Sequence, residues 1–249
     1  MSYKSSVLLT LVGWVLPVFT YYFVGTSLGE QLVSRTGVVD YTSFFVIGLA
    51  FQGYVSNVIG TISQRIRNEQ LYGTLEYYFL SPTGMFGLLV YSILWGFVLN
   101  TVSVVATLAV GSGLGVKYTP AGVEGAAIIV LLLLVSSFGL AMISAGTVLI
   151  TKTGDPVSFF FTTFTALIAG ALFPITVFPY YLKVVASFVP LTWALEGLRN
   201  ALLLGYGVPQ LSGIIGILIL FDLVTVPLGY AIFVACFNYS KKKGTLLEY

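Results

Sequence analysis

The stretch SQRIRNEQLYGTLEYYFLSPT, residues 63–83, is the longest polar interruption between two apolar segments of this chain. Only 8% of all residues are charged, yet this stretch holds four of them: Arg65, Arg67, Glu69 and Glu76. Arg65 and Glu69 are four residues apart and would share one face of a helix. Gly73 interrupts the helical pattern, and Ser81-Pro82 ends it. We predict a short amphipathic helix on a membrane surface that offers charge and tyrosine to a soluble partner.

Composition places the chain in a membrane. Its mean hydropathy is +0.99 and 57% of its residues are hydrophobic, whereas about a quarter of the residues of a soluble domain are charged. The 249 residues suffice for about six spanning helices of roughly 20 apolar residues each. The net charge of +2 gives no reason to expect nucleic-acid binding. Because the chain has no histidine and one cysteine, Cys236, we expect no catalysis, no metal site and no bound cofactor.

Six apolar segments are predicted to cross the lipid bilayer as helices. They cover residues of about 7–25, 42–62, 85–110, 125–150, 157–172 and 211–237. We interpret the first as a retained helix rather than a signal peptide, because Pro17 interrupts it and no clean cleavage site follows. In the fourth, Ser137, Ala141 and Ala145 recur every four residues, a spacing suited to close helix packing. Chance in an alanine-rich helix would give the same pattern.

Residues 173–207, FPITVFPYYLKVVASFVPLTWALEGLRNALLLGYG, do not fit a single long helix. Pro174, Pro179 and Pro190 divide them into apolar pieces that are too short to span a bilayer. Backbone of this kind at membrane depth must be covered by protein or line a cavity. We therefore predict a pair of short re-entrant helices, residues 180–189 and 191–204, between the fifth and sixth spans.

The loop GSGLGVKYTPAG, residues 111–122, shares glycines and a lysine with a nucleotide-binding loop. That motif requires Gly-Lys-Ser/Thr in direct succession. Here Val116 separates Gly115 from Lys117, and Tyr118 follows. We interpret the loop as a turn between two spans, so any ATPase that drives this protein must be a separate chain.

Residues 63–83 resemble a motif of the membrane subunits of type 2 ABC exporters, the ABC-2 permeases. That family carries a glutamate, then Gly-Thr, one residue, another glutamate and soon afterwards Ser/Thr-Pro. The matching residues here are Glu69, Gly73, Thr74, Glu76, Ser81 and Pro82. The resemblance implies a cytoplasmic coupling helix that sits in a cleft of the ATPase subunit, with Arg65, Arg67 and Tyr72 beside the motif. A solvated cytoplasmic loop is the alternative for this stretch alone.

The re-entrant segment resembles the same family. Its members have Phe-Pro, a second proline, and then Pro-Leu-Thr, an acidic residue and Leu-Arg. The matching residues here are Phe173, Pro174, Pro179, Pro190, Leu191, Thr192, Glu196, Leu198 and Arg199. Glu196 and Arg199 are three residues apart and could pair on one helix; we favour a structural role for them in an outer gate over substrate contact.

One feature departs from the family. ABC-2 permeases usually have a cytoplasmic amphipathic helix before the first span, and only about six residues precede that span here. Either the true start lies upstream, or the ATPase docks mainly through residues 63–83.

The resemblance implies a single all-α transmembrane domain over residues 1–249 that forms the export path. Two copies of this six-helix half, as a homodimer, would sit in the cell membrane above two ATPase subunits, which alone bind ATP and Mg. With both termini in the cytoplasm, seven lysines and arginines lie inside and four outside, as the positive-inside rule requires. The substrate stays open among drugs, lipids, polysaccharides and ions.

Asp222 lies within the sixth predicted span, where a charge costs about 2.5–3.5 kcal/mol. With Asn100 of the third span it is a candidate intramembrane polar residue. Asp222 either serves a substrate path or proton relay, or is a protonated or hydrogen-bonded residue of helix packing. The first interpretation supports an alternative function, a proton- or ion-coupled secondary transporter or channel, although no internal repeat is detectable.

Overall fold

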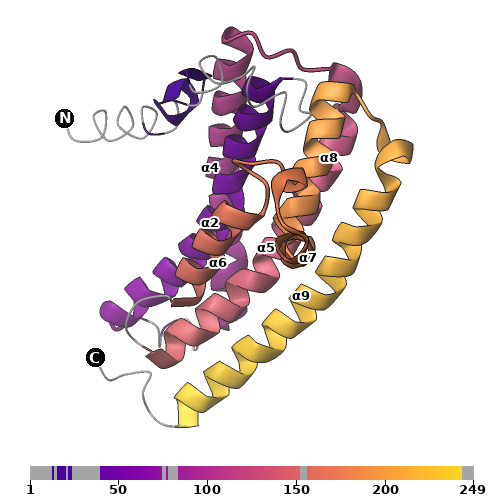
Figure 1. Cartoon of the computed structure of the whole chain (residues 1–249). Helices are drawn as coiled ribbons and strands as arrows, with labels where there is room; N and C mark the ends of the chain where they lie inside the picture. Colours follow the sequence, from indigo (N-terminus) through magenta and orange to yellow (C-terminus); the bar gives the residue numbers. More distant parts are fainter. Residues whose placement is uncertain are drawn as a thin grey trace, which may run out of the picture.

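The computed structural model describes residues 40–74, 77, 84–151 and 156–242, together with residues 13, 16–20, 22 and 23. Within these residues all regular structure is helical (Figure 1), which confirms the all-α prediction. The elements are α2 (Tyr41–Leu71), α4 (Gly84–Gly113), η1 (Pro120–Gly122), α5 (Val123–Thr151), α6 (Pro156–Ile168), η2 (Ile175–Val177), α7 (Tyr180–Ser187), α8 (Pro190–Leu204) and α9 (Val208–Lys242).

Four described helices are long and apolar enough to cross a membrane: Tyr41–Leu71, Val90–Gly113, Pro120–Thr151 and Val208–Lys242. They correspond to the second, third, fourth and sixth predicted spans. The first predicted span, residues 7–25, lies mostly outside the described residues. The fifth is α6, which has 13 residues and ends at Ile168, four residues before the predicted end. At 1.5 Å per residue it rises about 20 Å, less than the roughly 30 Å of the hydrocarbon core.

α2 is one continuous helix of 31 residues. Asp40 caps its start, because the Asp40 carboxylate accepts hydrogen bonds from the backbone N–H groups of Thr42 and Ser43 at 3.0 and 3.3 Å. We predicted a separate surface helix from residue 63, and that part of the prediction was wrong. No helix-breaking residue stands between the span and Gly73, so the helix continues, and Ile66 stays buried against the bundle.

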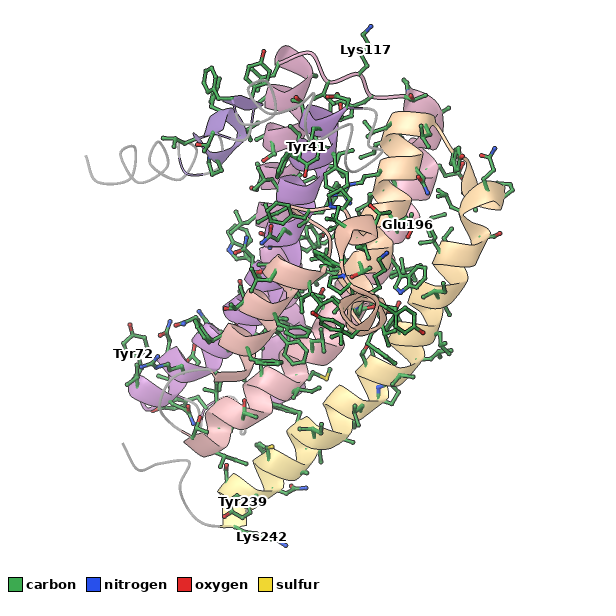
Figure 2. All side chains as sticks on the ribbon, viewed as in Figure 1. Tyr41, Tyr72, Lys117, Glu196, Tyr239 and Lys242 are labelled. Atoms are coloured by element: carbon green, nitrogen blue, oxygen red, sulfur yellow. The ribbon has the colours of Figure 1, made fainter. Side chains whose placement is uncertain are left out.

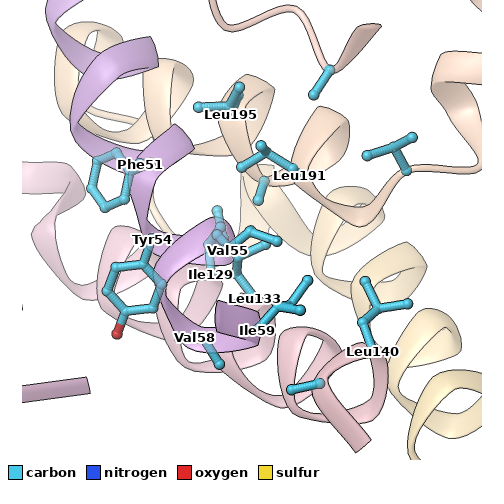
Figure 3. Close-up of a cluster of buried hydrophobic side chains, with 14 of the residues drawn as sticks. Phe51, Tyr54, Val55, Val58, Ile59, Ile129, Leu133, Leu140, Leu191 and Leu195 are labelled. Carbon is cyan, nitrogen blue, oxygen red and sulfur yellow. The ribbon is translucent and has the colours of Figure 1, made fainter. Parts of the chain in front are cut away.

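α5 lies at the centre of the bundle and packs against α2, α8 and α9. Aliphatic side chains from α2, α5 and α8 form the core that Figure 3 shows, with Val55, Leu133 and Leu191 among its members. The predicted small residues of α5 are buried: Ser137, Ala141 and Ala145. Ser144 lies beside them, and its hydroxyl oxygen accepts a hydrogen bond from the Ser63 hydroxyl of α2 at 2.8 Å.

The contact between α5 and α9 depends on glycines that the sequence analysis did not select. A Cβ atom on Gly229 would lie 2.2 Å from the carbonyl oxygen of Gly139, and one on Gly139 would lie 2.5 Å from the carbonyl carbon and oxygen of Thr225. The two backbones therefore touch directly, as in small-residue contacts between membrane helices.

The segment between α6 and α9 turns back within the bundle. The chain passes α2 closely at Ala171, since a Cβ on Gly48 would lie 2.1 Å from the Ala171 carbonyl oxygen. It then passes through η2 to α7 in the middle of the bundle (Figure 1). α8 leads to the end of the bundle that carries η1, where the Thr119 N–H donates to the Leu202 carbonyl at 2.8 Å. The predicted helices 180–189 and 191–204 are thus confirmed as α7 and α8 to within two residues.

Candidate functional site

The end of α2 contains the residues of the first motif that the structure describes. Arg65 Nε lies 3.0 Å from Glu69 Oε1, which confirms that the two share a helix face. The Thr74 hydroxyl also donates to the Glu69 carboxylate. Glu69 is only 7% exposed. Arg65 and Thr74 of the same chain therefore hold the carboxylate of this predicted docking residue.

Gly73 and Thr74 have a definite structural role, which is to stop α2. Gly73 adopts a left-handed conformation with φ of 66°. Its N–H donates to the Gln70 carbonyl at 3.1 Å, and the Thr74 N–H donates to the Glu69 carbonyl at 3.0 Å. This pair of bonds is a Schellman motif, which satisfies the last carbonyls of a helix and favours glycine at this position. Glu69, Gly73 and Thr74 of the family motif thus take part together in ending the helix.

The surface that remains for a partner at this end is formed by Arg65, Leu71 and Tyr72. The Arg65 side chain is half exposed, and Tyr72 is 77% exposed. Arg67 is half-buried. Figure 2 shows Tyr72 at the same end of the bundle as Lys242, with Lys117 at the opposite end. Three other predicted docking residues lie outside the described residues: Glu76, Ser81 and Pro82.

A polar groove of about 780 Å³ lies between α2 and α4, toward the Tyr72 end. It is lined by Ser56, Asn57, Gly60, Thr61, Gln64, Arg65, Asn68, Tyr91, Ser92 and Trp95. Asn100, predicted as an intramembrane polar residue, is buried and accepts a hydrogen bond from Asn57 at 2.7 Å. The sequence analysis missed Asn57. Its signal was available, because polar residues recur at 57, 61, 64 and 68, a helical spacing.

Arg199 connects three segments at the other end of the bundle. Its Nη2 atom lies 3.0, 3.3 and 3.4 Å from the carbonyl oxygens of Gly170, Phe44 and Ala171. The guanidinium carbon lies 3.4 Å from the centre of the Phe44 ring, a cation–π contact. The predicted pair with Glu196 was wrong: in the described part of the chain no carboxylate lies within 4.0 Å of Arg199. Backbone carbonyls replace it because segment 170–171 passes directly beside α2.

The prolines of the second motif mark the starts of short helices. Pro174 precedes η2, Pro179 precedes α7, and Pro190 is the first residue of α8. Proline suits these positions because its fixed φ matches the first helical turn, where its missing N–H is not needed. Phe173 is exposed beside them.

Asp222 is half-buried at the contact between α5 and α9. The Ser136 hydroxyl donates to its carboxylate. Within the described residues, no group of three potential metal ligands among histidine, cysteine and acidic residues is present. The Ser136 hydrogen bond therefore joins α5 to α9 at this residue.

Comparison with known proteins agrees with this architecture. The sequence model of the ABC-2 family transporter proteins matches residues 20–231. The chain is also similar to the linearmycin resistance permease protein LnrN of Bacillus subtilis (strain 168), with 30% identity over 103 residues. That match covers 39% of this chain and 27% of the relative.

The chain belongs to the ABC-2 family of transporter proteins, because the family match covers most of its length. It is therefore a transport membrane protein, as the two motifs predicted, and its family generally contributes the membrane subunit rather than a catalytic one.

Proposed function

We propose that this chain is the membrane-spanning subunit of an exporter, driven by a separate ATPase subunit that binds ATP and Mg. Two copies of the chain would form the path and two ATPase subunits would dock beneath them in the plasma membrane. The observation that carries this proposal is the continuity of α2 from Tyr41 to Leu71. The helix is about 46 Å long and joins the exposed Tyr72 end to the segment that Arg199 holds.

A rigid helix of this length can act as a lever. When ATP brings the two ATPase subunits together, force applied at Tyr72 would tilt α2 as a unit. The tilt would move Asn57, which lines the polar groove, and it would also move Phe44 near the start of α2. Because Phe44 contacts Arg199, the same motion would reach the segment between α6 and α8. Docking and opening of the path are then coupled without chemistry in this chain.

Charge distribution supports a cytoplasmic Tyr72 end. The end of the bundle with Tyr72 also carries Lys241 and Lys242, whereas Lys117 is at the opposite end (Figure 2). The positive-inside rule then favours cytoplasmic termini. The name of the B. subtilis relative refers to linearmycin resistance, which favours a toxic compound as the exported substrate over a polysaccharide or an ion.

Replacing Tyr72 with alanine is expected to weaken ATPase docking by at least about tenfold, because exposed aromatic residues dominate many protein interfaces. The fold should be unaffected, since the side chain is 77% exposed. The measurement is co-purification of the tagged chain with the ATPase encoded beside its gene, followed by an ATP hydrolysis assay.

Tyr206→Ala is the matched control, since Tyr206 is an exposed tyrosine at the Lys117 end. It should keep the ATPase bound. If the wild-type chain purifies alone from cells that contain the ATPase, the proposed function is wrong. If Tyr72→Ala and Tyr206→Ala retain the ATPase equally, docking does not involve this end of α2.

The alternative function, ion-coupled transport through Asp222, makes a separate prediction. In Asp222→Asn the side-chain amide oxygen can still accept the hydrogen bond from the Ser136 hydroxyl. We therefore expect most ATP-driven export to remain. Export from vesicles, measured once with ATP and once with an imposed proton gradient, distinguishes ATP-driven export from ion-coupled transport. Loss of export in Asp222→Asn, together with gradient-driven export by the wild type, would support secondary transport instead.

A further inference from the structure

A second cavity, of about 620 Å³, lies between α2, η2, α7 and α8. Its volume is within the range of ligand sites, roughly 300–1,000 Å³. Its lining differs from that of the polar groove because it contains three charged side chains: Lys183, Glu196 and Arg199. Aromatic and aliphatic residues, among them Phe44, Ile175 and Trp193, form the rest of the wall.

The charged side chains of this cavity form no close ion pair within the described part of the chain. Neither Lys183 nor Arg199 has a carboxylate within 4.0 Å there. Arg199 directs Nη2 at three carbonyls, and its Nε is buried without a hydrogen-bond partner among the described residues. The Thr192 hydroxyl, also in the wall, is buried and without a partner in the same part of the chain. Buried polar groups normally find partners, so the cavity is suited to a ligand that supplies acceptors.

The two short elements that help to line this cavity, η2 and α7, also carry exposed apolar side chains, as does Phe188 directly after α7. The exposed ones are Val177, Tyr180, Tyr181, Val184, Val185 and Phe188. Phe188 alone is 75% exposed. A charged pocket beside an exposed apolar surface suits an amphiphile, with a polar headgroup and an apolar chain, better than a free ion or a sugar.

The cavity reaches toward the end of the bundle that carries η1. Arg199 is five residues before the end of α8 at Leu204, which corresponds to about 8 Å along the helix. Phe44 is three residues after the start of α2 at the same end. The cavity therefore extends from α7, in the middle of the bundle (Figure 1), to one to two helical turns inside that end.

We propose that this cavity binds the headgroup of a zwitterionic phospholipid, with Lys183 and Arg199 on the phosphate and Glu196 on the ammonium group. The acyl chains lie along η2 and α7. Two cations and one anion complement a phosphate beside an amine, and charge-assisted hydrogen bonds to phosphate are among the stronger contacts that proteins make. The proposal goes beyond the proposed function and holds whichever ATPase the chain works with.

The test is a titration of the purified full chain in a neutral maltoside detergent with dihexanoyl phosphatidylethanolamine. Trp193 lines the cavity, so its fluorescence reports binding in a Trp14→Phe, Trp95→Phe background. Three further probes are titrated in parallel: dihexanoyl phosphatidylglycerol, dihexanoyl glycerol and inorganic phosphate. Size-exclusion elution and helix content establish that each variant is folded.

Lys183→Gln is expected to weaken the binding of both phospholipids about tenfold, because one hydrogen bond to a charged group is lost. Glu196→Gln should weaken the binding of phosphatidylethanolamine about tenfold and leave the binding of phosphatidylglycerol unchanged, because only phosphatidylethanolamine has an ammonium group. Lys117→Gln is the matched control, an exposed lysine outside the cavity at the same end, and should change neither.

Three results would overturn the proposal. Inorganic phosphate that binds as tightly as the phospholipids, with the same dependence on Lys183, would identify a free-phosphate site. Binding of dihexanoyl glycerol equal to that of the phospholipids would identify a nonspecific apolar surface. Absence of lipid binding, with dissociation of a dimer in Phe188→Asp, would assign the apolar surface to a second copy of this chain. None of these results bears on ATPase co-purification, so failure here is distinguishable from failure of the proposed function.

Discussion

Gly229→Leu is expected to leave little folded protein in the membrane. A Cβ atom at this position would lie 2.2 Å from the Gly139 carbonyl oxygen and 2.9 Å from its carbonyl carbon. Both are backbone atoms, so no side-chain rotation can relieve the overlap. α5 and α9 must separate along their contact, which also displaces Asp222 from Ser136. Overpacking usually costs about 1–3 kcal/mol, and backbone overlap belongs at or above the upper end of that range.

The measurement is the thermal unfolding midpoint of the detergent-purified chain, with membrane yield as a second readout. A loss of about 3 kcal/mol corresponds to a fall of roughly 6–12 °C for a chain of this size. Gly216→Leu is the matched control on the same helix, since a Cβ there meets nothing within 4 Å. Equal midpoints for the two variants would show that the α5–α9 contact is not as close as the structure has it.

Arg199→Lys is expected to be nearly as damaging to export as Arg199→Ala. The planar guanidinium both donates to carbonyls and stacks on Phe44, whereas an ammonium is a compact point charge that cannot do both. Without the guanidinium, the Gly170 and Ala171 carbonyls lose a charged donor, and α2 loses its link to this segment. A hydrogen bond to a charged group contributes about 1.5–3 kcal/mol, so the expected loss of stability in Arg199→Ala is about 3 kcal/mol.

Export assays and thermal unfolding of both variants test this prediction. Lys117→Ala serves as the control for loss of a positive charge at the same end of the bundle, and it should retain export. A double-mutant cycle of Arg199→Ala with Phe44→Leu should give a coupling of about 1 kcal/mol or more for the stacked pair. Wild-type export by Arg199→Lys would show that only the positive charge matters and would remove the proposed link between α2 and the short helices.

These two predictions and that for Tyr72 separate three roles along the bundle. Gly229 acts on stability through helix packing, Arg199 acts on the link between α2 and the segment before α8, and Tyr72 acts on a partner without affecting the fold. A variant of Tyr72 that lowered the unfolding midpoint as much as Gly229→Leu would contradict this separation.

Much of the fold followed from local properties of the sequence. Long apolar runs predicted the four helices of spanning length to within a few residues at most ends, because hydrophobicity and period are properties of the segment itself. The prolines predicted where the short helices begin, since a proline restricts its own backbone in any surroundings. The two motifs were sufficient to predict the family, and the family match over residues 20–231 confirmed it.

The side-chain partners were decided only by the tertiary structure. Sequence spacing paired Arg199 with Glu196, but carbonyls 28 and 29 residues away hold it instead. Spacing correctly paired Arg65 with Glu69 but did not indicate that the carboxylate is buried. The physical reason is that a helical period specifies which residues share a face, and not which element covers that face. The direct contact of Gly139 with Gly229, and the link of Asn57 to Asn100, exist only because α5 meets α9 and α2 meets α4.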